Sequence, residues 1–203
     1  MARQYTKRKR AQKEQQTRDA IARAAMELHE ELGPAQTTIS AIAKRAGVQR
    51  LTVYRHFPDE RDLFAACSSL YDELNPSPDP SDWLDSDDPE TRLRTGLSEI
   101  YDYYDRTEPM LSKVYRDLEL KPVLNDSMDD VGQYFEEVLR VLTEPWTSSG
   151  PGDRFIVAAI GHATHFMTWR SLVRFQGLSN EEAIDLMVSL VKSARSSEIA
   201  IEG

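Results

Sequence analysis

The sequence lacks the features that mark several classes of protein. It contains one cysteine, Cys67, which excludes an internal disulfide framework and suits a reducing compartment. Its longest apolar run, residues 155–160, is far shorter than the ~20 residues that a membrane-spanning helix requires. The basic N-terminus is not followed by the apolar stretch of a secretory signal. We therefore expect a soluble, cytoplasmic protein with no membrane association.

Motifs of catalysis are also missing. There is no glycine-rich phosphate loop, no nucleophile elbow and no cluster with the spacing of zinc ligands. His162 and His165, in GHATH, could hold a metal with carboxylates from a neighbouring helix, but no second pair of ligands is identifiable. Core or interface histidines are the simpler interpretation. We expect no enzyme activity, no cofactor and no metal.

Charge is distributed unevenly along the chain. Residues 1–62 contain 13 Lys and Arg against 8 Asp and Glu, a net charge of +5. Residues 63–203 contain 12 against 26, a net charge of −14. A polyanion would be attracted to the first third and repelled by the rest, which indicates two separate roles.

Apolar residues recur at three- and four-residue steps almost throughout, and no segment shows the alternation of a half-buried strand. The pattern predicts an all-α protein with a polar, frayed arm at its N-terminus. Residues 75–89, rich in Pro, Asp and Ser, are expected to form a loop. Helices are predicted at 17–32, 38–46, 48–56, 59–74, 90–106, 109–119, 122–143, 152–176 and 179–195.

Residues 38–57 have the pattern of a helix-turn-helix, in which Gly47 provides the tight turn between two short helices. Seven apolar side chains are predicted to point inward, namely Ile39, Ile42, Ala43, Ala46, Val48, Val53 and Phe57. Because Val53 and Phe57 are one helical turn apart and point inward, their neighbours on the second helix must point outward. These neighbours are Arg50, Leu51, Tyr54 and Arg55.

The outward face has the chemistry of a reader of the DNA major groove. Arg50 can donate to guanine, Leu51 can contact a thymine methyl group, and Gln49 can reach adenine. Hydroxyl and imidazole groups that can contact phosphates belong to Thr52, Tyr54 and His56. The alternative is an amphipathic hairpin with a solvated polar face, which would not favour an exposed leucine and tyrosine.

The stretch TTISAIAKRAGVQRLTVYRHFPDERDLF resembles the DNA-binding module of the TetR (tetracycline-repressor) family, and the resemblance covers about residues 17–65. It implies an N-terminal three-helix bundle with the helix-turn-helix, followed by a larger C-terminal helical bundle. It also implies DNA contacts for Thr38, Ser40, Gln49, Arg50, Leu51, Thr52, Tyr54, Arg55 and His56.

Three positions depart from the family pattern. Leu51 replaces a residue that is usually small, and His29 stands where the first helix often has phenylalanine. We expect His29 to be a partly buried packing residue rather than a pH sensor. Glu60 replaces a lysine near a phosphate, which indicates either good helix capping or a weaker phosphate contact, with Arg61 as the compensating cation.

The resemblance divides the chain into an arm at 1–16, a DNA-binding domain at 17–62 and an effector-binding and dimerisation domain at 63–203. The last two helices of the family form a dimer interface, although their apolar stripes are equally consistent with a core. Candidates for lining an effector pocket are Tyr101, Tyr104, Tyr115, Phe135, His162 and Phe166. Aromatic stripes of this kind more often belong to a core than to a pocket.

The resemblance implies a ligand-responsive transcriptional regulator, expected to be a repressor, that binds a palindromic duplex operator as a homodimer and responds to a small-molecule effector. The basic arm either lies along the minor groove or adjacent backbone, or is a solvated tail. The alternative function is an acidic helical small-molecule binder or metal-dependent enzyme whose hairpin is only structural.

Overall fold

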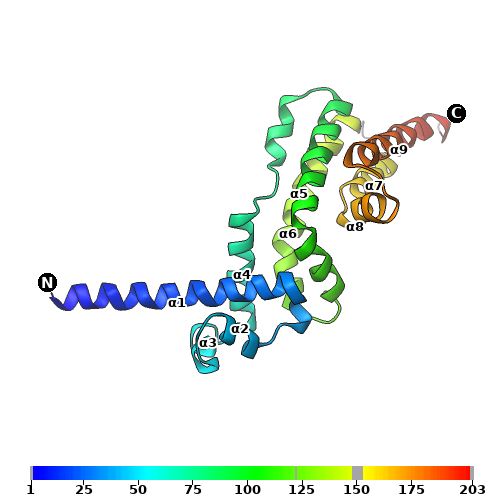
Figure 1. Ribbon diagram of the computed structural model, residues 1–203. Helices are drawn as coiled ribbons and strands as arrows, with labels where there is room; N and C mark the ends of the chain where they lie inside the picture. The colour runs from blue at the N-terminus through cyan, green and yellow to red at the C-terminus, as the bar shows by residue number, and fades with distance from the viewer. Residues whose placement is uncertain (1, 122, 148–152, 202–203) are drawn as a thin grey trace. The chain divides into compact units, whose positions relative to one another are not determined.

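The computed structural model describes residues 2–121, 123–147 and 153–201, and within these ranges the chain contains helices and no strands. This confirms the predicted all-α class. The α-helices, shown in Figure 1, are α1 (Ala2–Leu32), α2 (Ile39–Arg45), α3 (Arg50–His56), α4 (Glu60–Leu74), α5 (Pro89–Asp117), α6 (Val123–Thr143), α7 (Asp153–Ala163), α8 (Phe166–Arg170) and α9 (Asn180–Ile201). Short 3-10 helices occur at Pro34–Gln36, Pro80–Asp85 and Glu144–Trp146, and a π-helical turn at Ser171–Phe175.

The chain packs into two compact units. The first comprises Met1–Pro76 and Glu108–Asp129, and the second comprises Ser77–Thr107 and Asp130–Gly203. The predicted boundary at 62/63 does not coincide with this division, because α4 and the end of α5 pack with the helix-turn-helix. The functional domains at 17–62 and 63–203 stay predictions.

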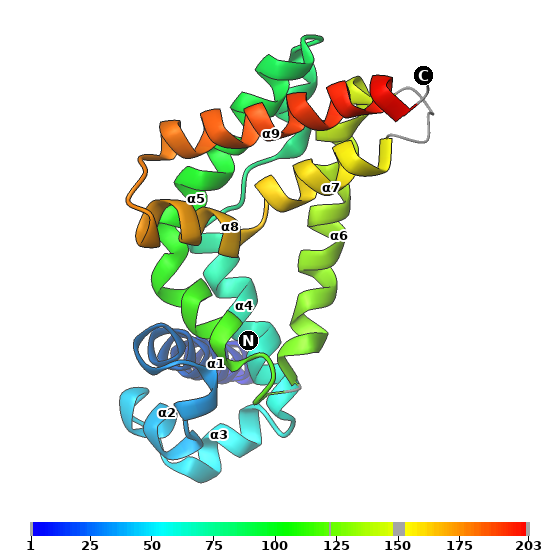
Figure 2. The same cartoon turned by 90° about the vertical axis from the view of Figure 1, so that its right-hand side faces the viewer.

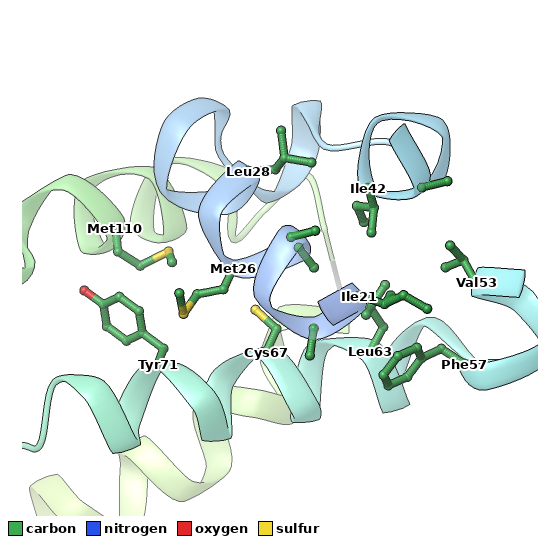
Figure 3. Packing of buried hydrophobic residues seen from close by; sticks show 14 residues of the cluster. Ile21, Met26, Leu28, Ile42, Val53, Phe57, Leu63, Cys67, Tyr71 and Met110 are labelled. Carbon is green, nitrogen blue, oxygen red and sulfur yellow. The ribbon is translucent and has the colours of Figure 1, made fainter. Parts of the chain in front are cut away.

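The core of the first unit joins α1 to the helix-turn-helix and α4 (Figure 3). The α1 stripe around Ile21, Ala25 and Leu28 is buried, as its spacing predicts. Val53 and Phe57 lie on the Ile21 side of the cluster, at α3 and its C-terminal end, while Tyr71 of α4 lies at the other end, beside Met26 and Met110. α1 is therefore the central element on which the shorter helices pack.

Three predicted helix boundaries are wrong. The expected frayed arm is helical from Ala2, because residues 2–16 contain no proline or glycine and are rich in helix formers. The two helices expected at 90–106 and 109–119 form one helix, α5, that continues through Pro109. The helix expected at 152–176 is interrupted after Ala163, where His165 caps a new helix by accepting the backbone N–H of Met167 at 3.1 Å. Residues 148–152, which include the expected start of that helix, lie outside the described residues.

The second unit is built around α7 and α9, which lie side by side in Figures 1 and 2. The break before α8 leaves carbonyl groups without helical partners, and two tyrosines of α5 bind them. The Tyr101 hydroxyl donates to the Ala163 carbonyl at 2.9 Å, and the Tyr104 hydroxyl donates to the Thr164 carbonyl at 2.6 Å. α9 begins with a predicted cap, in which the Ser179 and Glu182 side chains each accept the other's backbone N–H.

Candidate nucleic-acid interface

The helix-turn-helix is fixed by local backbone interactions. The Thr38 hydroxyl accepts the Ala41 N–H at 3.2 Å and caps the start of α2, as the sequence predicts. Gly47 has φ +68, a conformation that a side chain would resist, and the next residue, Val48, donates its N–H to the Ala43 carbonyl at 2.9 Å. This turn sets the direction in which α3 leaves α2.

The inward face of the motif is arranged as predicted. Ile42, Ala43, Val53 and Phe57 are buried in the core of the first unit. Ile39, Ala46 and Val48 are partly buried and pack against the same core. Since the apolar side of α3 is used in this way, the opposite side is left for solvent or a partner.

The outward face of α3 presents the predicted cationic and aromatic side chains. Leu51 is 77% exposed and Tyr54 is 46% exposed, which is unusual for two large side chains on one seven-residue helix. Arg50 and Arg55 are also exposed, and the Arg50 guanidinium donates to the Tyr54 hydroxyl at 3.4 Å. Gln49, at the N-cap, is exposed as well.

The candidate DNA-contacting residues outside this face differ in their exposure to solvent. Thr38, Ser40 and Arg61 are exposed, whereas Thr52 and His56 are half-buried. The Thr38 hydroxyl oxygen is used for the helix cap, but its proton can still be donated outward. The structure brings the α3 candidates onto one continuous face, and ligand contacts at every one of these positions stay predictions.

Arg18, a residue that sequence reasoning missed, holds the end of α3. Its guanidinium donates to the His56 carbonyl at 2.6 Å and lies 4.1 Å from the centre of the Phe57 ring. The carbonyl belongs to the last residue of α3, which has no helical donor. No local sequence pattern around Arg18 predicts this contact, because its partner is 38 positions away.

One basic residue of the motif belongs to the fold rather than to the exposed face. Arg45 donates to both carboxylate oxygens of Glu31, at 2.8 and 2.7 Å, and lies 3.4 Å from Glu27. The hydrogen bond from Arg45 holds the pKa of the Glu31 carboxyl below its usual range. This pairing ties α2 to α1 and removes Arg45 from the cations that face outward.

Glu60, the departure at the start of α4, also has a partner that the sequence did not reveal. Its carboxylate accepts a hydrogen bond from the Lys121 ammonium at 2.7 Å. The predicted capping role belongs to Asp59, whose side chain accepts the Arg61 N–H at 2.9 Å. Glu60 therefore forms an ion pair with the segment that follows α5.

His29 is a buried packing residue, as expected. Its ring stacks on Phe64 with centroids 4.9 Å apart, and its Nδ1 lies 3.3 Å from the Cys67 sulfur. Burial, with a smaller contribution from Lys121, lowers the pKa of His29 to about 4. Burial likewise raises the pKa of the Cys67 thiol to about 12, so that the thiol stays protonated.

The junction between α1 and α2 is held by the end of α5. We call Gly33 and Ala35 of the junction, with Arg116 and Asp117 of α5, the Asp117 cluster. The buried Asp117 carboxylate accepts the Ala35 N–H at 2.9 Å and a hydrogen bond from Arg116 at 2.7 Å. Arg116 also donates to the Leu32 carbonyl at 2.9 Å. Gly33 has φ +96, and a Cβ there would lie 2.1 Å from Arg116 and 2.5 Å from Asp117. Only glycine fits this junction.

The effector candidates are divided between the two units. Tyr101, Tyr104 and Phe166 are buried together, with Tyr104 and Phe166 ring centroids 5.3 Å apart, and both tyrosine hydroxyls are bound to backbone carbonyls. Tyr115 belongs to the first unit, whereas Phe135 belongs to the second and is half-buried. The two buried tyrosines thus provide hydrogen-bond donors for the carbonyl groups at the helix break before α8.

A different hollow contains His162, the remaining candidate. It has a volume of about 290 Å³ and is lined by His162, His165, Met167, Thr168, Ser171, Leu172 and Met187. The Nδ1 atom of His162 lies 3.2 Å from the Thr168 hydroxyl. Among the described residues, no group of three or more His, Cys, Asp or Glu side chains is placed to hold a metal ion.

The architecture and the exposed face together define a class, that of all-helical proteins with an N-terminal helix-turn-helix. Residues 21–67 match the family of bacterial regulatory proteins of the tetR type. Over 58 residues, or 29% of this chain, the sequence is 43% identical to the HTH-type transcriptional regulator AcrR of Shigella flexneri. The aligned part covers only 27% of that relative's length.

Two solved structures extend the likeness in fold. A putative fatty acid metabolism regulator of Clostridium perfringens is 17% identical and has a TM-score of 0.60, over 85% of this chain and 97% of that one. A TetR-like transcriptional regulator of Rhodococcus sp. RHA1 is 18% identical with a TM-score of 0.58, over 86% of this chain and 93% of that one. Residues 21–67 therefore resemble the DNA-binding region of the tetR family, and the two solved structures share the fold of this chain. Among the described helices, none is long and apolar enough to cross a membrane.

Proposed function

We propose that the protein is a transcriptional regulator that binds duplex DNA through the exposed face of α3. The observation that carries this proposal is the arrangement of Arg50, Leu51, Tyr54 and Arg55 on the solvent side of a helix whose other side is anchored in a core. Exposing Leu51 to water is unfavourable, and contact with a thymine methyl group would offset that cost. The match of residues 21–67 to the family supports the same conclusion.

The roles follow from chemistry and position. Arg50 and Gln49 lie at the start of α3, where side chains of a recognition helix contact base edges. Thr38, Ser40, Thr52, His56 and Arg61 would contact phosphates, which position the helix without specifying sequence. Arg18 is a positioning residue, because it holds the C-terminal end of α3 through the His56 carbonyl.

The proposal includes a homodimer acting on a palindrome, with half-site centres roughly one helical turn, ~34 Å, apart. A seven-residue recognition helix reads few base pairs, and pairing two copies doubles the recognised sequence. Exposed apolar side chains on α7 and α9 support pairing; they are Phe155, Val157, Leu186 and Leu190. Within one chain, the other sides of these two helices already pack together.

We further propose that a small-molecule effector releases the DNA, which makes the protein a repressor that acts in the cytoplasm. Support comes from the family and from α5, a continuous helix whose first part lies in the second unit and whose last part carries the Asp117 cluster. An effector that favoured another position of α5 would act on the junction before α2. The hollow beside His162, rather than the buried tyrosines, is the candidate entry for such a ligand.

The test is binding to duplex DNA recovered by selection from a random library. Wild-type protein should bind at low salt, and Tyr54→Ala should lose at least tenfold in affinity while its circular dichroism and melting temperature are retained. Tyr54→Phe, which keeps the ring and loses the hydroxyl, should fall between them. If the wild-type protein bound no duplex at low salt, the proposal would be wrong and a purely structural hairpin would be favoured.

A further inference from the structure

The first part of α1 is a helical segment that extends beyond the hydrophobic core of the first unit. Residues 2–16 continue α1 beyond its buried stripe, and Tyr5 and residues 7–16 are all exposed. Figure 1 shows this part of the helix extending alone, beyond α2 and α3. At 1.5 Å per residue it is about 22 Å long. We call residues 2–16 the helical arm.

The composition of the helical arm indicates that its binding partner is a polyanion. It contains six Lys and Arg residues against one acidic residue, Glu14. Tyr5 is its only large apolar side chain, so the arm lacks the apolar stripe with which an amphipathic helix enters a membrane surface. Cations near the N-terminus of a helix oppose the helix dipole, and bound phosphates would relieve this repulsion.

The contact of Arg18 with α3 shows which side of α1 faces the recognition helix. Arg18 donates to the His56 carbonyl at the end of α3. Because an α-helix turns about 100° per residue, Lys7 lies only about 20° from the direction of Arg18, and Arg8 and Arg10 lie about 80° to either side. Lys9 and Lys13 lie about 180° and 140° away, on the opposite side.

We propose that the helical arm binds the phosphate backbone of duplex DNA beside the segment read by α3, through Lys7, Arg8 and Arg10. This inference rests on the proposed DNA-binding function and extends it to the flanks of the operator. The arm ends two residues before Arg18, which contacts the C-terminal end of α3, and it is helical, so its cations project in fixed directions. Together, α3 reads bases and the arm adds affinity that does not depend on sequence.

The experiment compares two double variants of the full chain that remove equal charge from opposite sides of the arm. Lys7→Gln/Arg10→Gln changes the side facing α3, and Lys9→Gln/Lys13→Gln changes the other side. Glutamine is a good helix former, so circular dichroism should show equal helix content. Binding is titrated against salt on a selected duplex with flanks of about ten base pairs, and on the same duplex trimmed of its flanks.

Each phosphate contact contributes about 0.9 to the slope of log affinity against log salt concentration. The slope is negative, and we expect Lys7→Gln/Arg10→Gln to reduce its magnitude by about 2 on the long duplex. Lys9→Gln/Lys13→Gln should reduce the magnitude by less than half as much. On the trimmed duplex the first variant should match wild type.

Wild-type slopes in both variants on the long duplex would overturn the arm proposal and leave the function of α3 intact. Equal losses in the two variants would also overturn it, because only the total charge would then matter. If Lys7→Gln/Arg10→Gln instead lost binding to phosphatidylserine vesicles, with an unchanged DNA slope, the partner would be a membrane surface. A wild-type protein that binds no duplex would defeat the proposed function itself.

Discussion

At the scale of single residues, His29 shows how burial controls protonation. The imidazole stacks on Phe64 and contacts Cys67 inside the first unit, where a positive charge is poorly solvated. Its pKa is about 4 in the folded protein, against about 6.5 in an unfolded chain. Between these values the unfolded chain binds the proton and the folded protein does not. The stability that depends on neutral His29 is therefore complete above pH 6.5 and is lost as the pH falls toward 4.

We predict that His29→Phe removes this pH dependence. Phenylalanine can keep the stacking on Phe64, and it does not titrate. In wild type the contribution over the whole window is about 3 kcal/mol, so urea unfolding should show the free energy of unfolding falling more steeply between pH 7 and 4.5 than in the variant. Parallel curves for the two proteins would show that His29 titrates normally in the folded state.

At the scale of elements, the Asp117 cluster connects the end of α5 to the junction before α2. Asp117 is buried, and its hydrogen bond from Arg116, followed by that from the Ala35 N–H, holds the pKa of the carboxyl below its usual range. The carboxylate is thus charged at neutral pH, and its contribution to stability is lost only as the pH falls below about 4, through the lowered pKa.

We predict that Asp117→Ala destabilises the protein by about 2 to 3 kcal/mol, because it leaves the Ala35 N–H and the Arg116 guanidinium without their acceptor. Chemical denaturation measures the change, and DNA affinity should fall with it if the cluster positions the helix-turn-helix. Glu60→Gln is the matched control, since it breaks the exposed pair with Lys121 and should cost less than about 1 kcal/mol. Equal losses in the two variants would contradict a special role for Asp117.

At the scale of the whole molecule, the proposed function requires two copies of the chain. Leu186 and Leu190 lie one turn apart on the exposed side of α9, and Phe155 and Val157 are exposed on the neighbouring helix α7. The face of α9 with Leu186 and Leu190 is a candidate for self-association. The same helices supply their buried sides to the second unit, including Ile156, Ile160 and Val191.

We predict that Leu186→Asp/Leu190→Asp converts a dimer to a monomer in sedimentation velocity while circular dichroism is retained. Affinity for a palindromic duplex should fall by about 10² or more, because the second module would no longer be held near its half-site. Leu84→Asp/Leu120→Asp, which changes two other exposed leucines, is the control and should stay dimeric. A wild-type monomer at micromolar concentration would contradict the dimer.

The amino-acid sequence by itself determined the helix-turn-helix, because its signals are local. Apolar spacing fixes which side of α3 is buried, and Gly47 and the Thr38 cap fix the turn. The same stretch carries the resemblance to the tetR family, whose model matches residues 21–67, and charge segregation located the basic part of the chain.

Tertiary structure decided what depends on partners distant in sequence. Arg18 binds the end of α3, Glu60 meets Lys121, and Asp117 holds the junction beside Gly33, all across separations that no local pattern encodes. The helix break before α8 also could not be predicted from the sequence, because its carbonyl groups accept hydrogen bonds from Tyr101 and Tyr104 of α5. Local propensity specifies helices and turns, whereas the choice among buried polar partners is made only when the helices pack.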